Sequence, residues 1–349
     1  MILTKYQFPF QDFLERETGT FHLYHDETLP ERPRGTTVGH PVTGHGVLYV
    51  PTEARNALAA QLMAARNGFE GEIHFVNVKA ASKHSKLFLA AQRWIQLFFD
   101  ELNTQECSFK ATLALHAGPL HVPYADEEQW PKHLVRSTSH TIVGLTRFTR
   151  SRYNALHITP IFDATDNLVH RELYQRGVDF FARRSNKRRD AGNRKYPYIR
   201  TVPIEYRSSN PAEATGIDER IDAEFLQLSD LLLGSAEQAL GLRAGMNNGR
   251  LILADNLAQL MARTWGAPAY RYGQRARSFS VTLWPDRFGL PYAAVPVRKQ
   301  ALRVPQIPLP GSSEWELRGL LAPWPHSTGT VVTNAANTTP PAPQSPTPS

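Results

Sequence analysis

The sequence contains a single cysteine, Cys107, among 349 residues. One cysteine excludes an internal disulfide and a cysteine-rich metal site, and it is typical of proteins from a reducing compartment. Residues 1–17 lack a basic region followed by an apolar run, so no secretory signal is predicted. No uncharged apolar run approaches the roughly 20 residues that a membrane-spanning helix needs. We therefore expect a soluble, cytoplasmic protein without a membrane partner.

Hydrophobic residues make up 41% of the chain, which is enough to fill a large core. The formal charge of +7 permits a polyanionic partner but does not require one. From about residue 326 the composition changes to proline, serine and threonine, which cannot bury a core, so this tail is predicted to be disordered. The predicted divisions are an N-terminal extension (1–20), one α/β domain (21–290), a C-terminal extension (291–325) and the tail (326–349).

Apolar residues alternate between strand and helix periodicity along most of the chain. This alternation predicts an α/β domain with a mixed sheet. The predicted strands are 21–27, 45–51, 71–78, 108–116, 155–163, 198–207 and 278–285. The predicted helices are 52–68, 83–102, 133–153, 171–184, 224–240 and 249–265.

The helix predicted at 224–240 is apolar around most of its circumference. Gln227, Asp230 and Gly234 follow at intervals of three and four residues, so they stack on one thin polar face. Two interpretations are open. The helix is either largely buried and exposes a slim polar edge, or Asp230 faces a cleft in which Gly234 leaves room for another group to approach.

The phrase "LQLSDLLLG" (226–234) resembles a signature near the end of the domain of unknown function 3800 family. Three further phrases match that family in the same order: "YHDET" (24–28), "GEIHFVNVKAASKHSK" (71–86) and "ITPIFD" (158–163). The resemblance covers roughly residues 20 to 285. The sequence departs from the family at Leu29, where a glycine is usual, and its lysines come later in the second phrase.

The resemblance implies a ribonuclease-H-like fold, in which acidic residues from separate elements gather around divalent metal. The residues that match the family's acidic positions are Asp26, Glu72, Asp163 and Asp230. Two divalent ions about 4 Å apart stabilise both the attacking and the leaving oxygen when a phosphodiester is hydrolysed. Mg²⁺ or Mn²⁺ is the expected cofactor, because hard cations bind carboxylate oxygens and keep several waters.

The strand at 21–27 allows a choice between its two acids. Alternation places Asp26 on the face of His22 and Tyr24, and it places Glu27 on the opposite face, so we expect Asp26 to be the ligand. Taken singly, each candidate acid is also explained as a solvated residue at the end of a strand. That explanation is strongest for Asp163, which begins the Asp-rich turn "DATD".

A basic run, "RRSNKRRDAGNRKYPYIR", occupies residues 183–200. We interpret it as a loop that lies along phosphates near the acidic residues, with tyrosine rings available for stacking, although charge runs are also common on solvated surfaces. The predicted nucleic-acid-binding residues are Arg183, Arg184, Lys187, Arg188, Arg189, Arg194 and Lys195.

Three functions are compatible with these patterns. The first is a metal-dependent nuclease or related phosphoesterase that uses the four acids. The second is a non-catalytic nucleic-acid-binding or protein-interaction module on the same fold. The third is an α/β protein whose acids are structural.

Overall fold

The computed structural model describes residues 18–28, 42–79, 84–100, 107–115, 129–149, 153–193, 196–239, 247–266 and 279–284. The predicted tail at 326–349, the extension at 291–325 and most of the extension at 1–20 lie outside these residues, as do Arg194 and Lys195. None of the described helices is long and apolar enough to cross a membrane.

A seven-stranded mixed sheet forms the centre of the described chain, and it confirms the α/β prediction. The strands are β1 (Thr18–Thr28), β2 (Val42–Pro51), β3 (Ser108–Leu115), β4 (Ala155–Asp163), β5 (Tyr198–Thr201), β6 (Glu205–Arg207) and β7 (Phe279–Trp284). Their order is β5-β4-β1-β2-β3-β7, and β6 pairs with the end of β4. β1, β2 and β3 form an antiparallel meander, and β4 joins the other side of β1 in parallel.

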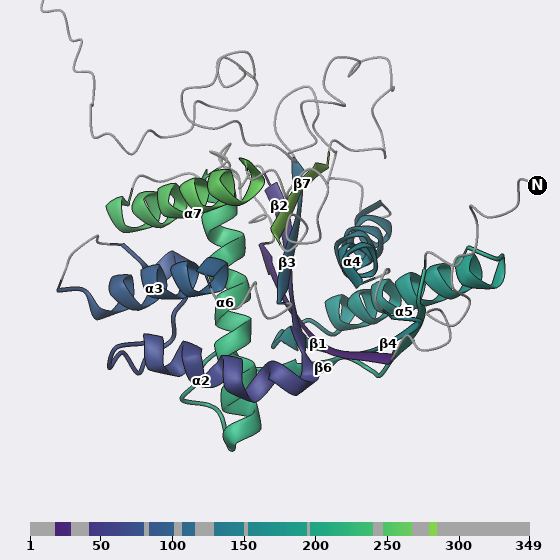
Figure 1. The fold of residues 1–349 in the computed structure, drawn as a ribbon, viewed down its shortest axis with the longest axis horizontal. Helices are drawn as coiled ribbons and strands as arrows, with labels where there is room; N and C mark the ends of the chain where they lie inside the picture. Colours follow the sequence, from purple (N-terminus) through teal and green to yellow (C-terminus); the bar gives the residue numbers. More distant parts are fainter. Residues whose placement is uncertain are drawn as a thin grey trace, which may run out of the picture.

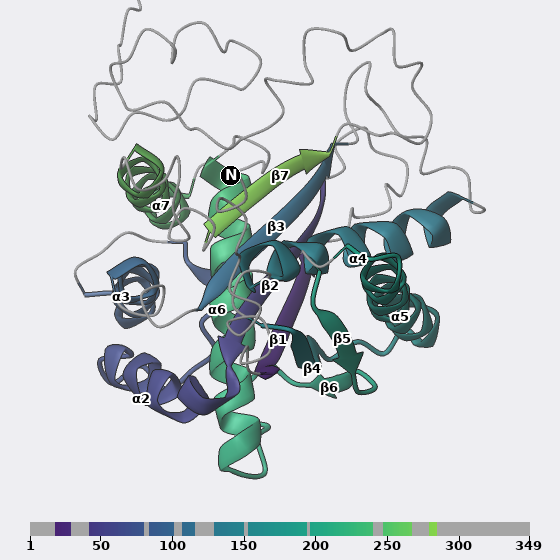
Figure 2. The ribbon, with the colours of Figure 1, turned by 45° about the vertical axis from the view of Figure 1, so that its right-hand side comes forward.

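Helices cover both faces of the sheet (Figure 1). They are α2 (Arg55–Ala65), α3 (Lys86–Asp100), α4 (Gln129–Thr149), α5 (Leu168–Asp190), α6 (Ile217–Ala239) and α7 (Asn248–Gly266), with short 3-10 turns at Thr52–Ala54 and Phe75–Asn77. α6 crosses one face along β1 and β2, with α2, α3 and α7 outside it, and α4 and α5 cover the other face (Figures 1 and 2).

Each face of the sheet has its own apolar core. Tyr24 and Leu48 pack with α2, α3, α6 and α7 on one side, whereas Leu23 and Val47 pack with α4 and α5 on the other. Alternation along the strands thus sorts neighbouring residues between two helical layers. Because α6 lies between the sheet and an outer layer of helices, it is buried from residue 221 to residue 239. Its apolar circumference is explained by this position.

Two predicted elements are wrong. Residues 71–78 form no strand: the segment contains only the 3-10 turn Phe75–Asn77, and side chains of α6 bind its backbone N–H groups. The basic run is not a loop over its first half, because α5 continues to Asp190 and ends with Lys187, Arg188 and Arg189 in its last turn. Cations are favourable at that end of a helix, where the carbonyl groups carry partial negative charge.

Candidate functional site

Asp26 and Asp163 lie side by side at the carboxyl ends of two parallel strands. The register between β1 and β4 pairs His25 with Phe162, so the next residue of each strand is an aspartate. Alternation puts both aspartates on the face that α6 covers, as predicted for Asp26. Both side chains are partly buried.

Asp230 reaches the same place from α6. Ser229 donates a hydrogen bond to the carbonyl oxygen of Tyr24 at 3.4 Å, which sets the helix against the end of β1. Burial raises the pKa of Asp26 well above its ordinary value, and the charges of Asp230 and Asp163 raise it further. Burial and the charge of Asp230 likewise raise the pKa of Asp163, although hydrogen bonds from Ser209 oppose the shift. Three of the four predicted acids therefore interact electrostatically.

Glu72, the fourth predicted acid, joins the others through one serine. The backbone N–H of Ser209 donates to Asp163 Oδ1 at 3.0 Å, and the hydroxyl of the same serine donates to Glu72 Oε1 at 3.0 Å. Glu72 is partly exposed. Ser209 follows β6 in the chain, and no pattern in the sequence singled it out. We call Asp26, Glu72, Asp163 and Asp230 the acidic cluster.

The thin polar face of α6 has a structural partner, which is the segment that was predicted to be a strand. Gln227 Oε1 accepts the N–H of Ile73 at 2.7 Å, and Asp230 Oδ2 accepts the N–H of Phe75 at 2.6 Å. These side chains accept the backbone hydrogen bonds that a neighbouring strand would otherwise accept. A Cβ atom on Gly234 would lie 2.5 Å from the Phe75 ring. The glycine therefore admits Phe75, which is the group that approaches α6 at this position.

His74 and Glu27 flank the acidic cluster, and the sequence reasoning assigned neither a role. His74 Nδ1 lies 3.6 Å from Asp230 Oδ2, and its ring is partly exposed. Glu27 points to the opposite face of β1, as alternation predicted, and burial raises its pKa to about 7. The pattern "EIH" at 72–74 gave no signal for His74 beyond its place beside a candidate acid.

Glu27 begins a buried polar chain that runs under β1. His25 Nδ1 lies 3.7 Å from Glu27, its Nε2 lies 3.1 Å from His45 Nδ1, and His45 Nε2 lies 2.9 Å from the hydroxyl of Ser137. The ring of His25 also stacks on Phe162, with centroids 4.0 Å apart. Burial lowers the pKa of His25 to about 3, so the ring is neutral at physiological pH. These histidines fix adjacent strands beneath the acids.

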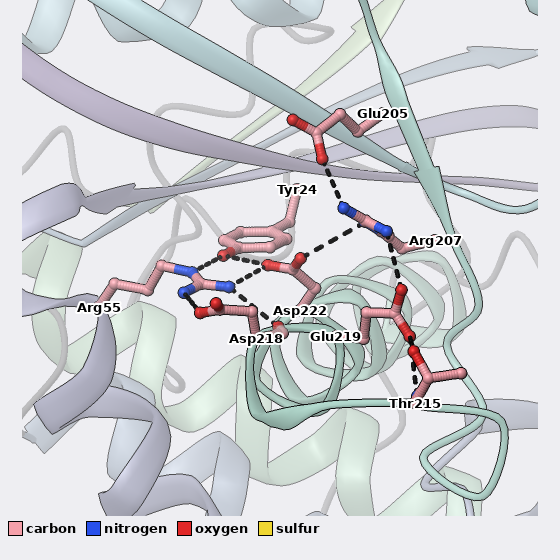
Figure 3. Close-up of polar contacts among 8 residues, drawn as sticks. All are labelled: Tyr24, Arg55, Glu205, Arg207, Thr215, Asp218, Glu219 and Asp222. Carbon is pink, nitrogen blue, oxygen red and sulfur yellow. Dashed lines mark hydrogen bonds and ion pairs between the residues drawn. The ribbon is translucent and has the colours of Figure 1, made fainter.

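A second group of acids lies at the start of α6, and it is paired with arginines (Figure 3). Arg55 donates to Asp222 at 2.6 Å, to Asp218 at 3.0 Å and to the hydroxyl of Tyr24 at 2.9 Å. Arg207 bridges Glu205 of β6 at 2.7 Å and Glu219 of α6 at 2.9 Å. We call these residues the arginine-paired group.

The basic residues of α5 lie far from the acidic cluster. α5 begins just after β4 and runs back along it, so its last turns come beside the start of β5, where Tyr198 pairs with Ala155. Arg188 donates to the hydroxyl of Tyr196 at 2.8 Å and lies over its ring at 5.0 Å. Arg183, Arg184 and Lys187 are exposed. The prediction that this run lies near the acids is therefore wrong.

The oxygen-only composition of the acidic cluster fits a hard divalent cation. In the described part of the chain, no group of three or more histidine, cysteine, aspartate or glutamate side chains is arranged to hold a metal ion. Asp230 and Asp163 instead accept hydrogen bonds from backbone N–H groups. Magnesium is commonly bound directly by only one or two carboxylates, with water and substrate phosphates completing its shell.

Comparisons with family models, with curated proteins and with solved structures found no match to this chain.

Proposed function

We propose that the protein is a metal-dependent nuclease or related phosphoesterase whose reaction takes place at the acidic cluster. The observation that carries the proposal is the convergence of Asp26, Asp163 and Asp230 from two strand ends and one helix, where burial and then the charges of the other two acids raise the pKa of Asp26. No arginine or lysine of the described chain forms an ion pair with Asp26 or Asp163. Such an arrangement is unfavourable without a cation and becomes favourable when one binds.

The topology supports a ribonuclease-H-like assignment. An antiparallel meander of β1 to β3, extended on the β1 side by the parallel strands β4 and β5, is the mixed sheet expected from the family resemblance. Acids at the ends of β1 and β4 and on a later helix occupy the places that this resemblance implies. The resemblance to the domain of unknown function 3800 family is part of the proposal.

Asp26 and Asp163 would hold Mg²⁺ or Mn²⁺, with Asp230 and Glu72 placed to bind its water ligands. When bound, the cation would offset negative charge on a phosphodiester and lower the pKa of an attacking water. The hydrogen bonds from Ser209 and Phe75 fix two of these carboxylates in orientation, which limits their rearrangement during a reaction. His74 lies beside Asp230, with its Nδ1 3.6 Å from Asp230 Oδ2.

The test is cleavage of a panel of single- and double-stranded DNA and RNA with Mg²⁺ or Mn²⁺. Asp26→Asn and Asp163→Asn are each expected to reduce cleavage by at least about 100-fold, because each removes a charge that holds the cation. Glu172→Gln, an exposed acid on α5, serves as the control and is expected to retain full activity. Full activity of both asparagine variants would overturn the proposal.

Metal binding can be measured separately from cleavage. A saturating cation that binds only the folded chain raises the free energy of unfolding, by about 2.7 kcal/mol at a hundred times its Kd. We expect Mn²⁺ to stabilise the wild-type chain and not the Asp26→Asn chain. Mn²⁺ binding without cleavage of any substrate would favour the non-catalytic nucleic-acid-binding alternative, and the absence of both would favour structural acids.

A further inference from the structure

The last two turns of α5 present an exposed group of cations that the acidic cluster does not use. The group consists of Arg183, Arg184, Lys187, Arg188 and Arg189. Arg184 and Lys187 form no ion pair with any residue in the described ranges, and Arg183 donates only to the carbonyl of Asp179, at 3.4 Å. We call this group the basic end of α5.

Two arginines of the basic end lie over tyrosine rings beside it. Arg188 covers one face of Tyr196 at 5.0 Å, and Arg189 lies over Tyr198 at 5.5 Å. The cations that stay exposed, Arg183, Arg184 and Lys187, present guanidinium and ammonium groups, which bind phosphate oxygens without reading bases. This surface chemistry fits the backbone of a nucleic-acid duplex better than the unstacked bases of a single strand.

The distance between the two sites follows from the elements that join them. β4 has nine residues and ends at Asp163, and α5 has 23 residues and runs back beside it. At about 3.3 Å per strand residue and 1.5 Å per helix residue, the basic end lies on the order of 25 to 30 Å from the acids. That span corresponds to about eight base pairs at 3.4 Å each.

We propose that the basic end of α5 is a remote anchor for the phosphate backbone of a duplex whose scissile part lies at the acidic cluster. A substrate must then reach about eight base pairs beyond the site of cleavage to use both contacts. The length requirement rests on the proposed function, because it assumes cleavage at the acidic cluster. Binding of a duplex by the basic end does not depend on that function. Along α5, which links the two sites in the chain, Glu172 pairs with Arg176 at 3.7 Å. The contacts are therefore expected at the two ends of the span.

Two matched double variants of the full chain test the anchor. Arg184→Gln with Lys187→Gln removes one arginine and one lysine from the basic end. Arg93→Gln with Lys86→Gln removes the same charges from exposed positions on α3, on the opposite face of the sheet. Binding of a labelled duplex of about 20 base pairs is measured by fluorescence anisotropy over a range of salt concentrations, in the Asp26→Asn background.

The first double variant is expected to lower the slope of log K against log salt by about 2 and to weaken binding about tenfold near 0.1 M salt. The α3 variant is expected to match the unaltered background in this assay. In the cleavage-competent chain, the first variant should raise KM for the long duplex and leave kcat unchanged. It should not alter cleavage of a hairpin with a stem of about six base pairs.

The outcomes separate the inference from the proposed function. A loss of salt-dependent binding without cleavage of any substrate would support the anchor and overturn the proposed function. Cleavage that is indifferent to stem length and to both double variants would support the function and overturn the anchor. If only binding to polyglutamate depends on Arg184 and Lys187, the surface serves an acidic protein and the proposal is wrong.

Discussion

One helix, α6, contributes to two groups of acids that are treated in opposite ways. At its start, Asp222 is buried but receives hydrogen bonds from Arg55 and Tyr24, and Arg207 lies 3.9 Å away (Figure 3). Two turns later, Asp230 faces Asp26 and Asp163 with no arginine between them. Burial raises the pKa of both Asp222 and Asp26, but arginine opposes the shift at Asp222 and other acids increase it at Asp26.

At Asp222 a neighbouring arginine stabilises the charged carboxylate. At Asp26 neighbouring acids destabilise it. Buried charge is tolerated when it is paired, and an unpaired cluster persists only because the surrounding structure stabilises it. Such clusters are enriched at functional sites. The contrast supports the proposal that the arginine-paired group serves the fold and the acidic cluster serves chemistry, and the following changes can break or sharpen that proposal.

Removing Arg55 is expected to have the largest effect on stability. Arg55→Met leaves Asp222 buried without its closest cation, and we expect the free energy of unfolding to fall by about 3 to 5 kcal/mol. Urea denaturation measures the loss. Arg176→Met, which removes an arginine from an exposed pair on α5, is the control and should cost less than about 0.5 kcal/mol. Similar losses in both variants would remove the structural role from the arginine-paired group.

The raised pKa of Glu27, near the end of β1, should make the free energy of unfolding fall as pH rises. The folded chain raises the pKa of Glu27 from 4.5 to about 7, so the folded state binds its proton more tightly than the unfolded state does. The free energy of unfolding should then decrease as pH rises from about 4.5 to 7, by up to about 3 kcal/mol from this residue. Glu27→Gln should flatten the curve of stability against pH, and an unchanged slope would contradict the raised pKa.

Gly234→Ala tests how tightly segment 71–78 is held beside the acids. The new methyl group would meet the Phe75 ring at 2.5 Å and its Cβ at 2.8 Å, so Phe75 must shift, which disturbs the hydrogen bond from its backbone N–H to Asp230. We expect a loss of about 1 to 3 kcal/mol in urea denaturation. Gly192→Ala provides a contrast of another kind, because nothing lies within 4 Å of its Cβ position and only its positive φ of 82° opposes the change.

Asp26→Asn should change the free energy of unfolding least, and the direction of the change is what tests the comparison. In metal-free buffer at about pH 8, the variant removes a charge that its neighbours repel, so we expect stability to increase by about 1 kcal/mol. Asp222→Asn should destabilise the chain under the same conditions, because it removes a charge that arginine stabilises. Destabilisation by both variants would erase the distinction between the two groups.

Short-range patterns in the sequence singled out two of the acids, Asp26 and Asp230. Alternation in β1 distinguished Asp26 from Glu27, and helical spacing placed Gln227, Asp230 and Gly234 on one face. Their convergence came from the ordered resemblance, since strand pairing between residues far apart in the chain leaves no local pattern. The register that sets Asp26 beside Asp163 is such a long-range pairing.

The errors arose where tertiary contacts override local pattern. "EIHFVNV" has the apolar content of a strand, but side chains of α6 bind its N–H groups, so no neighbouring strand is required. Arginine and lysine are good helix formers, and they are favoured at the C-terminal end of a helix, where free carbonyl groups carry partial negative charge. The basic run therefore extends α5. The placement of the cations beside β5 depends on the crossover from β4 to β5, which composition does not reveal.

The hydrogen bond from Tyr24 to Asp222 joins residues 198 positions apart, and that from Ser229 to Tyr24 joins residues 205 positions apart. During synthesis, β1 emerges from the ribosome long before α6 exists to cover it. The chain must close this large loop before the central strand gains its helical partner, and such non-local closure slows folding. Until then the apolar face of the meander stays open to association with other chains, so this protein is expected to depend on chaperones or on low expression temperature for a good yield.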